Sequence, residues 1–185
     1  LGSPDYQKAI TQHKAYIKAL QSCGLEVHVL ESCEDYPDST FVEDVALITP
    51  KCAIFTRPGA ESRRGEVEQI ETVLRDQFDN AERVEAPGTI EAGDIMMVDN
   101  HYYIGLSDRT NIQGAEQIIG ILNKYGYTGS TVNLKEVLHL KTGLSYLENS
   151  QLVICGEFKN DPIFSRFDHI DIPEEESYAA NCIWV

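Results

Sequence analysis

The sequence is poor in basic side chains. Lys and Arg number 15 against 30 Asp and Glu, which gives a formal net charge of -15. A chain this acidic repels nucleic acids and anionic membrane surfaces and favours small cationic ligands. Long apolar runs are lacking too, because none approaches the roughly 18 residues that a membrane-spanning helix needs. We therefore expect a small-molecule partner and neither a nucleic acid nor a membrane.

Paired cysteines and a leader segment are also lacking. An odd number of cysteines is scattered along the chain, at Cys23, Cys33, Cys52, Cys155 and Cys182. This spacing suits neither a disulfide framework nor a zinc site, so we expect a reducing, cytoplasmic location. The start of the chain lacks the basic and then apolar pattern of a signal peptide. Leu1 is not an initiator residue, so we expect further residues before it.

What is present is a mixed α/β pattern with enough apolar residues for a core. The chain has 185 residues, of which 42% are hydrophobic, and this predicts a single domain over residues 1–185. Apolar residues at three- and four-residue spacings predict a helix from Asp5 to Ser22. Val27 and Val29 alternate with polar residues and predict a short strand.

From residue 45 onward, a strand–strand–helix–strand pattern repeats about every 50 residues. The first unit has strands at 45–48 and 53–56, a helix from near Ser62 and a strand near Val84. The second has strands at 95–98 and 102–105, a helix at 112–122 and a strand at 131–132; the third has strands at 145–147 and 152–155, a short helix at 161–166 and a strand at 170–172. A fourth hairpin is expected to open at 181–185. Such a repeat predicts modules arranged around an axis or in a row.

The unusual polar residues lie just before the three hairpins. These lead-in segments are Glu43-Asp44, Glu91–Asp94 and His139–Gly143, and Asp44 and Asp94 are 50 residues apart. If the modules circle an axis, equivalent segments converge on it. We therefore expect Asp44, Glu91 and His139 to face one cavity.

Two arginines add a second equivalent position. Arg63 and Arg109 stand near predicted helix starts, where they could hold a carboxylate, although a surface ion pair is as good an interpretation of each alone. The acids of Asp38–Asp44 around Phe41 suit a cation, or are a solvated loop. Together these residues suit an arginine-like ligand. Attack on a guanidinium carbon needs a nucleophile such as a thiolate, and none of the five cysteines stands in a convincing setting.

The motifs resemble those of a known family. They are Pro37–Asp44, Thr56–Glu66, Glu91–Asp94, Arg109–Asn111 and Leu138–Gly143, and in combination they are similar to dimethylarginine dimethylaminohydrolase of the bacterial type. The resemblance runs over the whole chain. It implies the guanidino-group-modifying (pentein) superfamily, whose fold is a propeller of five ββαβ modules, with about three and a half present here.

The resemblance also implies an activity and residue roles. The reaction is hydrolysis of Nω,Nω-dimethyl-L-arginine or Nω-methyl-L-arginine to L-citrulline and an amine, through a thiouronium intermediate on cysteine and without metal or cofactor. His139 would be the acid/base and Glu91 its partner, and Asp44 would bind the guanidinium. Asp38 would bind the α-amino group, Arg63 and Arg109 the α-carboxylate, while Phe41 and Glu43 would line the pocket. A homodimer is possible.

The chain departs from the family in one respect. The nucleophilic cysteine of the family lies near its C-terminus in a Gly-rich segment that these 185 residues lack. We therefore expect this cysteine beyond residue 185, and no turnover from the 185-residue chain alone. The alternatives are an arginine deiminase or amidinotransferase relative and, from a different class, a non-catalytic arginine-binding module.

Overall fold

The structure is a computed structural model that describes residues 3–185. The chain divides into two compact units, one taking in the chain up to Ser32 together with Val185, the other running from Cys33 to Trp184. The single domain expected over residues 1–185 stays a prediction.

The first unit contains the predicted helix. Helix α1 spans Tyr6–Ser22, and the side chain of Asp5 caps its N-terminus by accepting a hydrogen bond of 3.0 Å from the backbone N–H of Lys8. The helix ends at Cys23, and Gly24 follows with φ of 88°. The strand predicted at Val27 and Val29 is wrong. No strand of the described chain pairs with this segment, and an alternating pattern without a partner forms no ladder.

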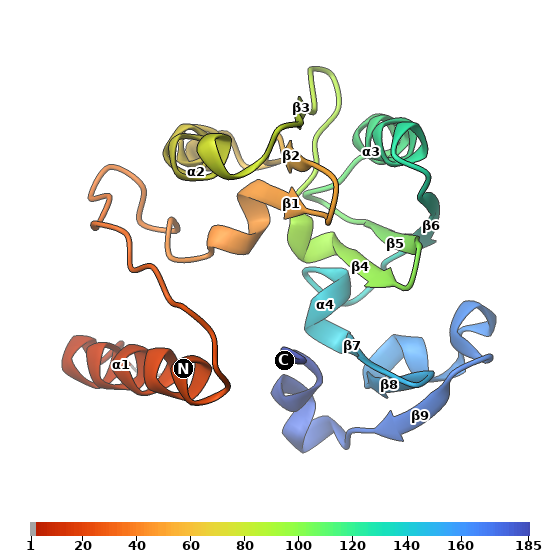
Figure 1. Cartoon of the computed structure of the whole chain (residues 1–185). Coiled ribbons are helices and arrows are strands. Elements are labelled where there is room, and N and C mark those ends of the chain that lie inside the picture. The colour runs from red at the N-terminus through yellow and green to blue at the C-terminus, as the bar shows by residue number, and fades with distance from the viewer. Residues whose placement is uncertain (1–2) are drawn as a thin grey trace. The chain divides into compact units, whose positions relative to one another are not determined.

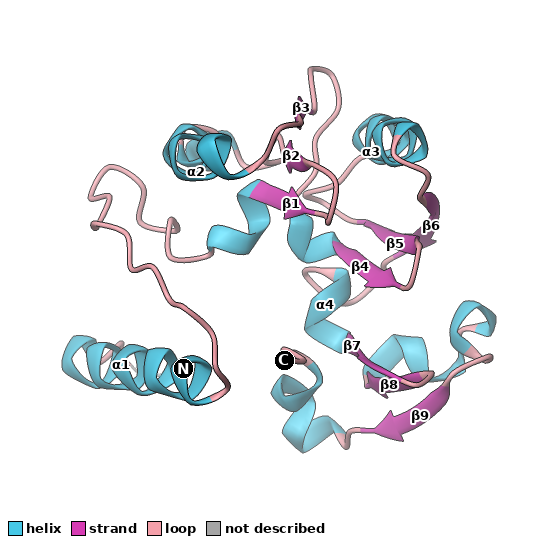
Figure 2. Cartoon of the chain, viewed as in Figure 1, coloured by secondary structure: helices cyan, strands magenta, loops and turns pink. Residues whose placement is uncertain are grey.

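The second unit contains three sheets of three strands each. The strands are β1 (Ala46–Ile48), β2 (Ala53–Phe55) and β3 (Ala81–Arg83) in the first sheet, β4 (Ile95–Val98), β5 (His101–Leu106) and β6 (Thr128–Asn133) in the second, and β7 (Leu144–Glu148), β8 (Gln151–Ile154) and β9 (Asp168–Asp171) in the third. In every sheet the first two strands are antiparallel and the third is parallel to the second (Figure 2). The predicted threefold repeat of strand–strand–helix–strand units is confirmed for the strands.

The connecting helices differ between the units. Helix α2 spans Glu66–Leu74 and starts later than predicted, because a separate 3-10 turn occupies Glu61–Arg63. Helix α3 spans Ile112–Lys124, as predicted. In the third unit two 3-10 turns, Gly156–Asn160 and Pro162–Phe164, replace the predicted helix. The hairpin expected to open at residues 181–185 is absent, since this described segment forms no strand.

Each hairpin is preceded by a short helical segment. These segments are the 3-10 turns Val42–Val45 and Ala92–Asp94 and the one-turn helix α4 (Leu140–Gly143), which lead into β1, β4 and β7. The second segment contacts both of the others, and the three lie together in the middle of the second unit (orange, green and cyan in Figure 1). The repeat thus places three equivalent segments, far apart in sequence, side by side.

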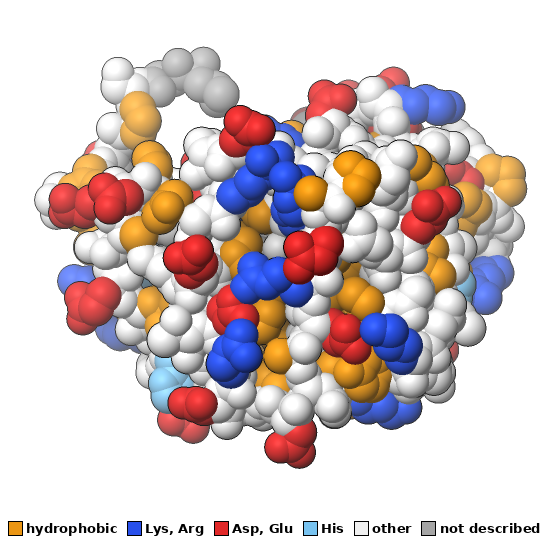
Figure 3. Space-filling view, turned by 90° about the horizontal axis from the view of Figure 1, so that it is seen from above, with side chains coloured by type: hydrophobic (Ala, Val, Ile, Leu, Met, Phe, Trp, Pro, Cys, Tyr) orange, Lys and Arg blue, Asp and Glu red, His pale blue; other side chains and the backbone are white. Residues whose placement is uncertain are grey.

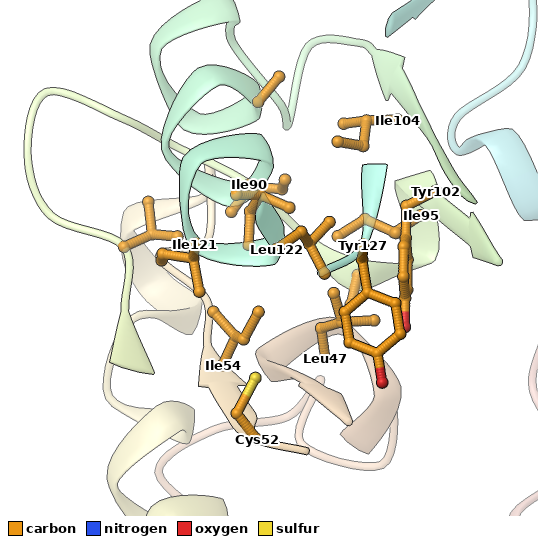
Figure 4. Packing of buried hydrophobic residues seen from close by; sticks show 14 residues of the cluster. Leu47, Cys52, Ile54, Ile90, Ile95, Tyr102, Ile104, Ile121, Leu122 and Tyr127 are labelled. Carbon is orange, nitrogen blue, oxygen red and sulfur yellow. The ribbon is translucent and has the colours of Figure 1, made fainter. Parts of the chain in front are cut away.

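The middle sheet is buried on both faces. Tyr102 and Ile104 of β5 point into a cluster that α3 completes with Ile118 and Leu122, while Tyr103 points to the opposite side. Figure 4 shows the first cluster, in which Leu47 and Ile54 of the first hairpin face side chains of α3. The other cluster joins the middle sheet to Leu152, Phe158 and Phe164 of the third unit. Since burying one such side chain contributes about 1.5–3 kcal/mol, the two clusters hold the three lead-in segments in fixed positions.

Within residues 3–185, no helix has both the length and the apolar character to cross a bilayer.

Candidate active site

Asp44 is fixed at the end of its 3-10 turn. Its side chain is buried, and its Oδ1 accepts a hydrogen bond of 3.1 Å from the backbone N–H of Gly93. Its Oδ2 accepts one of 2.7 Å from Nη1 of Arg63. The backbone carbonyl of Asp44 accepts a third bond, of 2.8 Å, from the hydroxyl of Thr56 on the strand side. The carboxylate therefore has one orientation, set by two other segments of the chain.

Gly93 leaves no space for a side chain at the centre of the site. A Cβ atom on Gly93 would lie 2.6 Å from Oδ1 of Asp44 and 3.1 Å from Cγ of His139. Contacts under 3.0 Å require the neighbours to move. The glycine of the lead-in segment thus allows a carboxylate and an imidazole to approach the same backbone from two sides.

Glu91 is a buried carboxylate with one oxygen unpaired. The residue is 1% exposed; its Oε2 lies 3.4 Å from Nε2 of His139 and 3.6 Å from Nη1 of Arg63. Its Oε1 has no hydrogen-bond partner within residues 3–185. Burial raises the pKa of Glu91, and the charge of Asp44 raises it further, while His139, Arg63 and Arg109 act in the opposite direction. An unpaired buried oxygen is costly, so this atom is suited to a donor from outside the protein.

His139 lies between two carboxylates. Its Nε2 faces Glu91, and its Nδ1 lies 3.3 Å from Oδ1 of Asp94 without the alignment of a full hydrogen bond. Burial lowers the pKa of His139, but the contact with Asp94 and the charges of Asp44 and Glu91 outweigh it, so the pKa is raised. The imidazole is therefore suited to hold and release a proton near neutral pH.

Asp94 belongs to the site although the sequence analysis gave it no role. It is completely buried, and its Oδ1 accepts a hydrogen bond of 3.0 Å from the backbone N–H of Leu140. Its Oδ2 accepts bonds from the hydroxyls of Ser107, at 2.7 Å, and Thr110, at 2.6 Å. The signal for Asp94 was its register, because it precedes the second hairpin as Asp44 precedes the first.

Arg63 lies among the acids. It is 5% exposed, and Nε and Nη2 donate to the carboxylate of Glu66, with the shortest contact, from Nη2, at 2.8 Å. Nη2 also lies 3.3 Å from the backbone oxygens of Asp38 and Phe41. Burial acts to lower the pKa of Arg63, but the carboxylates of Glu66 and Asp44 outweigh it and raise the pKa, so the guanidinium stays charged. Its N–H groups are thus largely engaged by the protein, and its expected grip on a substrate carboxylate stays a prediction. Glu66, which the sequence analysis also missed, stands three residues after it.

Arg109 stands apart from this network. It is half-buried on the loop that joins β5 to α3, and within residues 3–185 its guanidinium has no hydrogen-bond partner. Gly59 lets another loop approach its backbone, because a Cβ there would lie 2.6 Å from the carbonyl oxygen of Arg109. Its guanidinium is available for a ligand.

Three other expected site residues are exposed. The side chains of Asp38 and Phe41 lie on the surface, Phe41 at 57% exposure, with its ring 5.8 Å from the guanidinium carbon of Arg63. Glu43 forms an ion pair of 2.5 Å with Nζ of Lys141 from the third lead-in segment. The structure therefore brings Asp44, Glu91, His139 and Arg63 together and leaves Asp38, Phe41 and Glu43 on the surface.

The close group of possible ligand atoms contains no thiol. Atoms of Asp44, Glu91 and His139 lie within 4.8 Å of one another, and in the described chain no cysteine joins them. Burial raises the pKa of the Cys52 and Cys155 thiols, which makes both poor nucleophiles. By spacing alone the three residues could hold a metal ion, but Oδ2 of Asp44 already accepts a hydrogen bond from Nη1 of Arg63, so one carboxylate oxygen of the group is occupied. We assign no metal ligand among them.

A surface depression beside α2 is the other candidate site. It is lined by Glu68, Glu71, Thr72, Arg75, Asp76 and Arg83, and Glu71 forms ion pairs with both arginines. Acidic and basic side chains are also intermixed over the face shown in Figure 3. Because both of its arginines pair with Glu71, neither is free to hold a ligand there.

Comparison with known proteins gives consistent results. A sequence profile described as N,N dimethylarginine dimethylhydrolase, eukaryotic, matches residues 4–166. The N(G),N(G)-dimethylarginine dimethylaminohydrolase of Pseudomonas aeruginosa is 62% identical over 186 residues, covering 100% of this chain and 73% of the relative. A protein of the same description from Streptomyces coelicolor is 33% identical over 172 residues, covering 92% of this chain and 66% of its own.

Solved structures agree. The P. aeruginosa enzyme, as a cysteine-to-serine variant complexed with citrulline, superimposes with a TM-score of 0.98 at 60% identity, covering 100% of this chain and 72% of that one. The N-terminal domain of a cyanobacterial arginine dihydrolase shares the fold, with a TM-score of 0.87 at 18% identity and coverage of 98% and 70%.

The three mixed sheets and their shared polar centre thus define an α/β protein of the pentein fold. Within that class, the chain belongs to the dimethylarginine dimethylaminohydrolase family.

Proposed function

We propose that the complete protein hydrolyses Nω,Nω-dimethyl-L-arginine or Nω-methyl-L-arginine to L-citrulline and dimethylamine or methylamine. The observation that carries this proposal is the unpaired Oε1 of Glu91, buried beside His139. Three buried carboxylates, Asp44, Glu66 and Glu91, surround one fixed cation, Arg63, so the site has an excess of negative charge that can bind a second guanidinium. Membership of the family supports the same substrate class.

The residues divide the substrate between them. Asp44 and Glu91 accept hydrogen bonds from the guanidinium nitrogens, in the paired geometry that carboxylates offer to such groups. Arg109 holds the α-carboxylate and is better placed for it than Arg63, whose donors are engaged. Asp38 binds the α-amino group, while Phe41 and Glu43 line the outer part of the pocket; these three residues are exposed without substrate.

The chemistry uses a cysteine beyond residue 185 as nucleophile. Its thiolate bonds to the guanidinium carbon, the bond to the departing amine breaks, and His139 donates a proton to that nitrogen. A water then adds to the thiouronium carbon and gives one proton to His139, the carbon–sulfur bond breaks, a second proton passes to solvent, and citrulline and the thiolate form. The raised pKa of His139 suits both steps, since the imidazolium must first give a proton and then regain it.

The test measures citrulline release by the complete protein from dimethylarginine and from arginine. We expect turnover of dimethylarginine and at least a roughly 100-fold loss of kcat in His139→Ala. The matched control is His13→Ala, an exposed position on α1, which should retain wild-type turnover.

Three results would count against the proposal. A preference for plain arginine would indicate a deiminase instead. Unchanged turnover in His139→Ala would remove this imidazole from the mechanism, and binding without any turnover would favour a non-catalytic arginine-binding module.

A further inference from the structure

The carboxylate of Asp94 contacts two segments, one that carries His139 and one that carries Arg109. On one side, Oδ1 accepts from the backbone of Leu140 and lies 3.3 Å from Nδ1 of His139. On the other side, Oδ2 accepts from Ser107 and Thr110, the residues that flank Arg109 in the loop before α3. One buried carboxylate therefore contacts both the candidate acid/base and the loop of the free arginine.

The hydroxyls of Ser107 and Thr110 also accept hydrogen bonds from the backbone. The Oγ of Ser107 accepts from the backbone N–H groups of Arg109, at 3.0 Å, and Thr110, at 3.2 Å. The Oγ1 of Thr110 accepts from the backbone N–H of Glu91, at 3.2 Å. Because both hydroxyls donate to Asp94, their lone pairs are available for these backbone donors.

This pattern requires a carboxylate and not merely a polar side chain. Every hydrogen-bonding partner of the Asp94 carboxylate is a donor, and an ionised carboxylate is a pure acceptor. An asparagine of the same shape has one acceptor oxygen, and its NH₂ group would face donors on one side. With an NH₂ group at the Oδ2 position, the two hydroxyls could no longer donate to residue 94. With the NH₂ group at the Oδ1 position, the N–H of Leu140 would lose its acceptor.

We propose that Asp94 is a positioning residue for both halves of the site, orienting the His139 imidazole through Nδ1 and fixing the Ser107–Thr110 loop that presents Arg109. The inference rests on the proposed function, because that function gives His139 and Arg109 their roles. A proton held on Nδ1 by Asp94 leaves Nε2, on the Glu91 side, to exchange protons with the substrate.

The experiment compares Asp94→Asn with Ser107→Ala and Thr110→Val in the complete protein. The readouts are kcat and KM for dimethylarginine and the NMR titration of the His139 imidazole. Asp94→Asn should lower kcat at least about tenfold. It should also lower the His139 pKa, in part only, because Asp44 and Glu91 still face the ring and Arg63 stays beside Glu91.

The hydroxyl variants should behave differently. Ser107→Ala and Thr110→Val each remove a bond to Oδ2 and the bonds that the hydroxyl accepts from the backbone, but they leave the contact of Oδ1 with Nδ1 of His139. They should therefore raise KM about fivefold without moving the His139 pKa. They also keep the proposal testable if Asp94→Asn fails to fold. Asp99→Asn is the matched control, since Asp99 is exposed in the turn of the same hairpin, with a φ of 54° that asparagine tolerates, and it should match the wild type.

Clear outcomes would overturn the proposal. One is an Asp94→Asn variant with wild-type kcat and wild-type His139 titration; another is a shift of that titration, or no rise in KM, in both hydroxyl variants. The titration needs no turnover. A wild-type protein that releases no citrulline would therefore refute the proposed function while the test of Asp94 still gives its answer.

Discussion

Arg63 and Asp44 form a buried ion pair of 2.7 Å between Nη1 and Oδ2, in which each side chain is about one-tenth exposed or less. The same guanidinium holds Glu66 through Nε and Nη2. The guanidinium of Arg63 thus donates to two carboxylates from different segments at once. A single ammonium group cannot reproduce this arrangement of donors.

The first prediction is that Arg63→Lys strongly destabilises the protein. Lysine would leave Asp44 or Glu66 buried without its partner, and such a change lowers the free energy of unfolding by about 3–5 kcal/mol. Urea unfolding measures it. The matched control is Arg64→Lys, because the ion pair of Arg64 with Glu61 is largely exposed, and it should cost less than about 1 kcal/mol. Equal losses of unfolding free energy in the two variants would show that the guanidinium of Arg63 has no special role.

The second prediction concerns the glycine at the centre of the site. Gly93→Ala should reduce stability by about 1–3 kcal/mol and reduce dimethylarginine turnover, because the new methyl group must displace Asp44 or His139. Gly120→Ala is the control. Gly120 lies in α3 with open space around its Cβ position, so alanine there should stabilise the protein by about 0.5–1 kcal/mol. A neutral Gly93→Ala would show that the site is looser than the structure indicates.

The third prediction is a pH dependence from His139. Its pKa is raised above the ordinary value of 6.5, so the folded protein binds this proton more tightly than the unfolded chain. The resulting stabilisation is fully present below pH 6.5 and is lost as the pH rises through the folded-state value. Denaturation at several pH values should show the wild type losing stability relative to His139→Gln across this window. A difference that grows with pH would have the wrong sign.

The fourth prediction concerns Glu157, which holds the segment before His139. Its carboxylate accepts hydrogen bonds from the backbone N–H groups of Lys135, Glu136 and Val137. Burial acts to raise the pKa of Glu157, but these bonds outweigh it and lower the pKa below the ordinary value of 4.5. Its stabilisation is therefore present above pH 4.5 and is lost as the pH falls through the lower folded-state value.

Glu157→Gln tests this arrangement. It should cost about 1 kcal/mol at neutral pH, a modest value because the group is partly exposed, and the cost should shrink in acid. Glu136→Gln, an exposed change on the same segment, should cost under about 0.5 kcal/mol. A cost for Glu157→Gln that is independent of pH would argue against a role for its charge.

The repeat explains how much of the fold the sequence could predict. The hairpins carry their own apolar alternation, and their spacing of about 50 residues indicated that Asp44, Glu91 and His139 meet. The strand expected at Val27 and Val29 failed because alternation does not supply a partner strand. The helix expected at 161–166 failed because Pro162 starts a single 3-10 turn that Asp161 caps through the backbone N–H of Ile163.

The site was predicted less completely, for a physical reason. Register places a residue near a centre but does not say which atom its side chain meets. Asp94 and Glu66 escaped notice because their importance comes from the directions of their hydrogen bonds. Glu66 did leave a signal, since it stands three residues after Arg63, a spacing at which side chains can pair.

The caps and burial of α1 have a consequence for hydrogen exchange. Helix α1 has 17 residues and a capped N-terminus, yet none of its side chains is buried, whereas five residues of the 13-residue α3 are buried. Local opening of α1 therefore exposes little apolar surface, while opening α3 disrupts the cluster around Tyr102. The amides of α1 should therefore exchange with deuterium faster than those of α3. The two rates should differ by several orders of magnitude if α3 exchanges only through global unfolding.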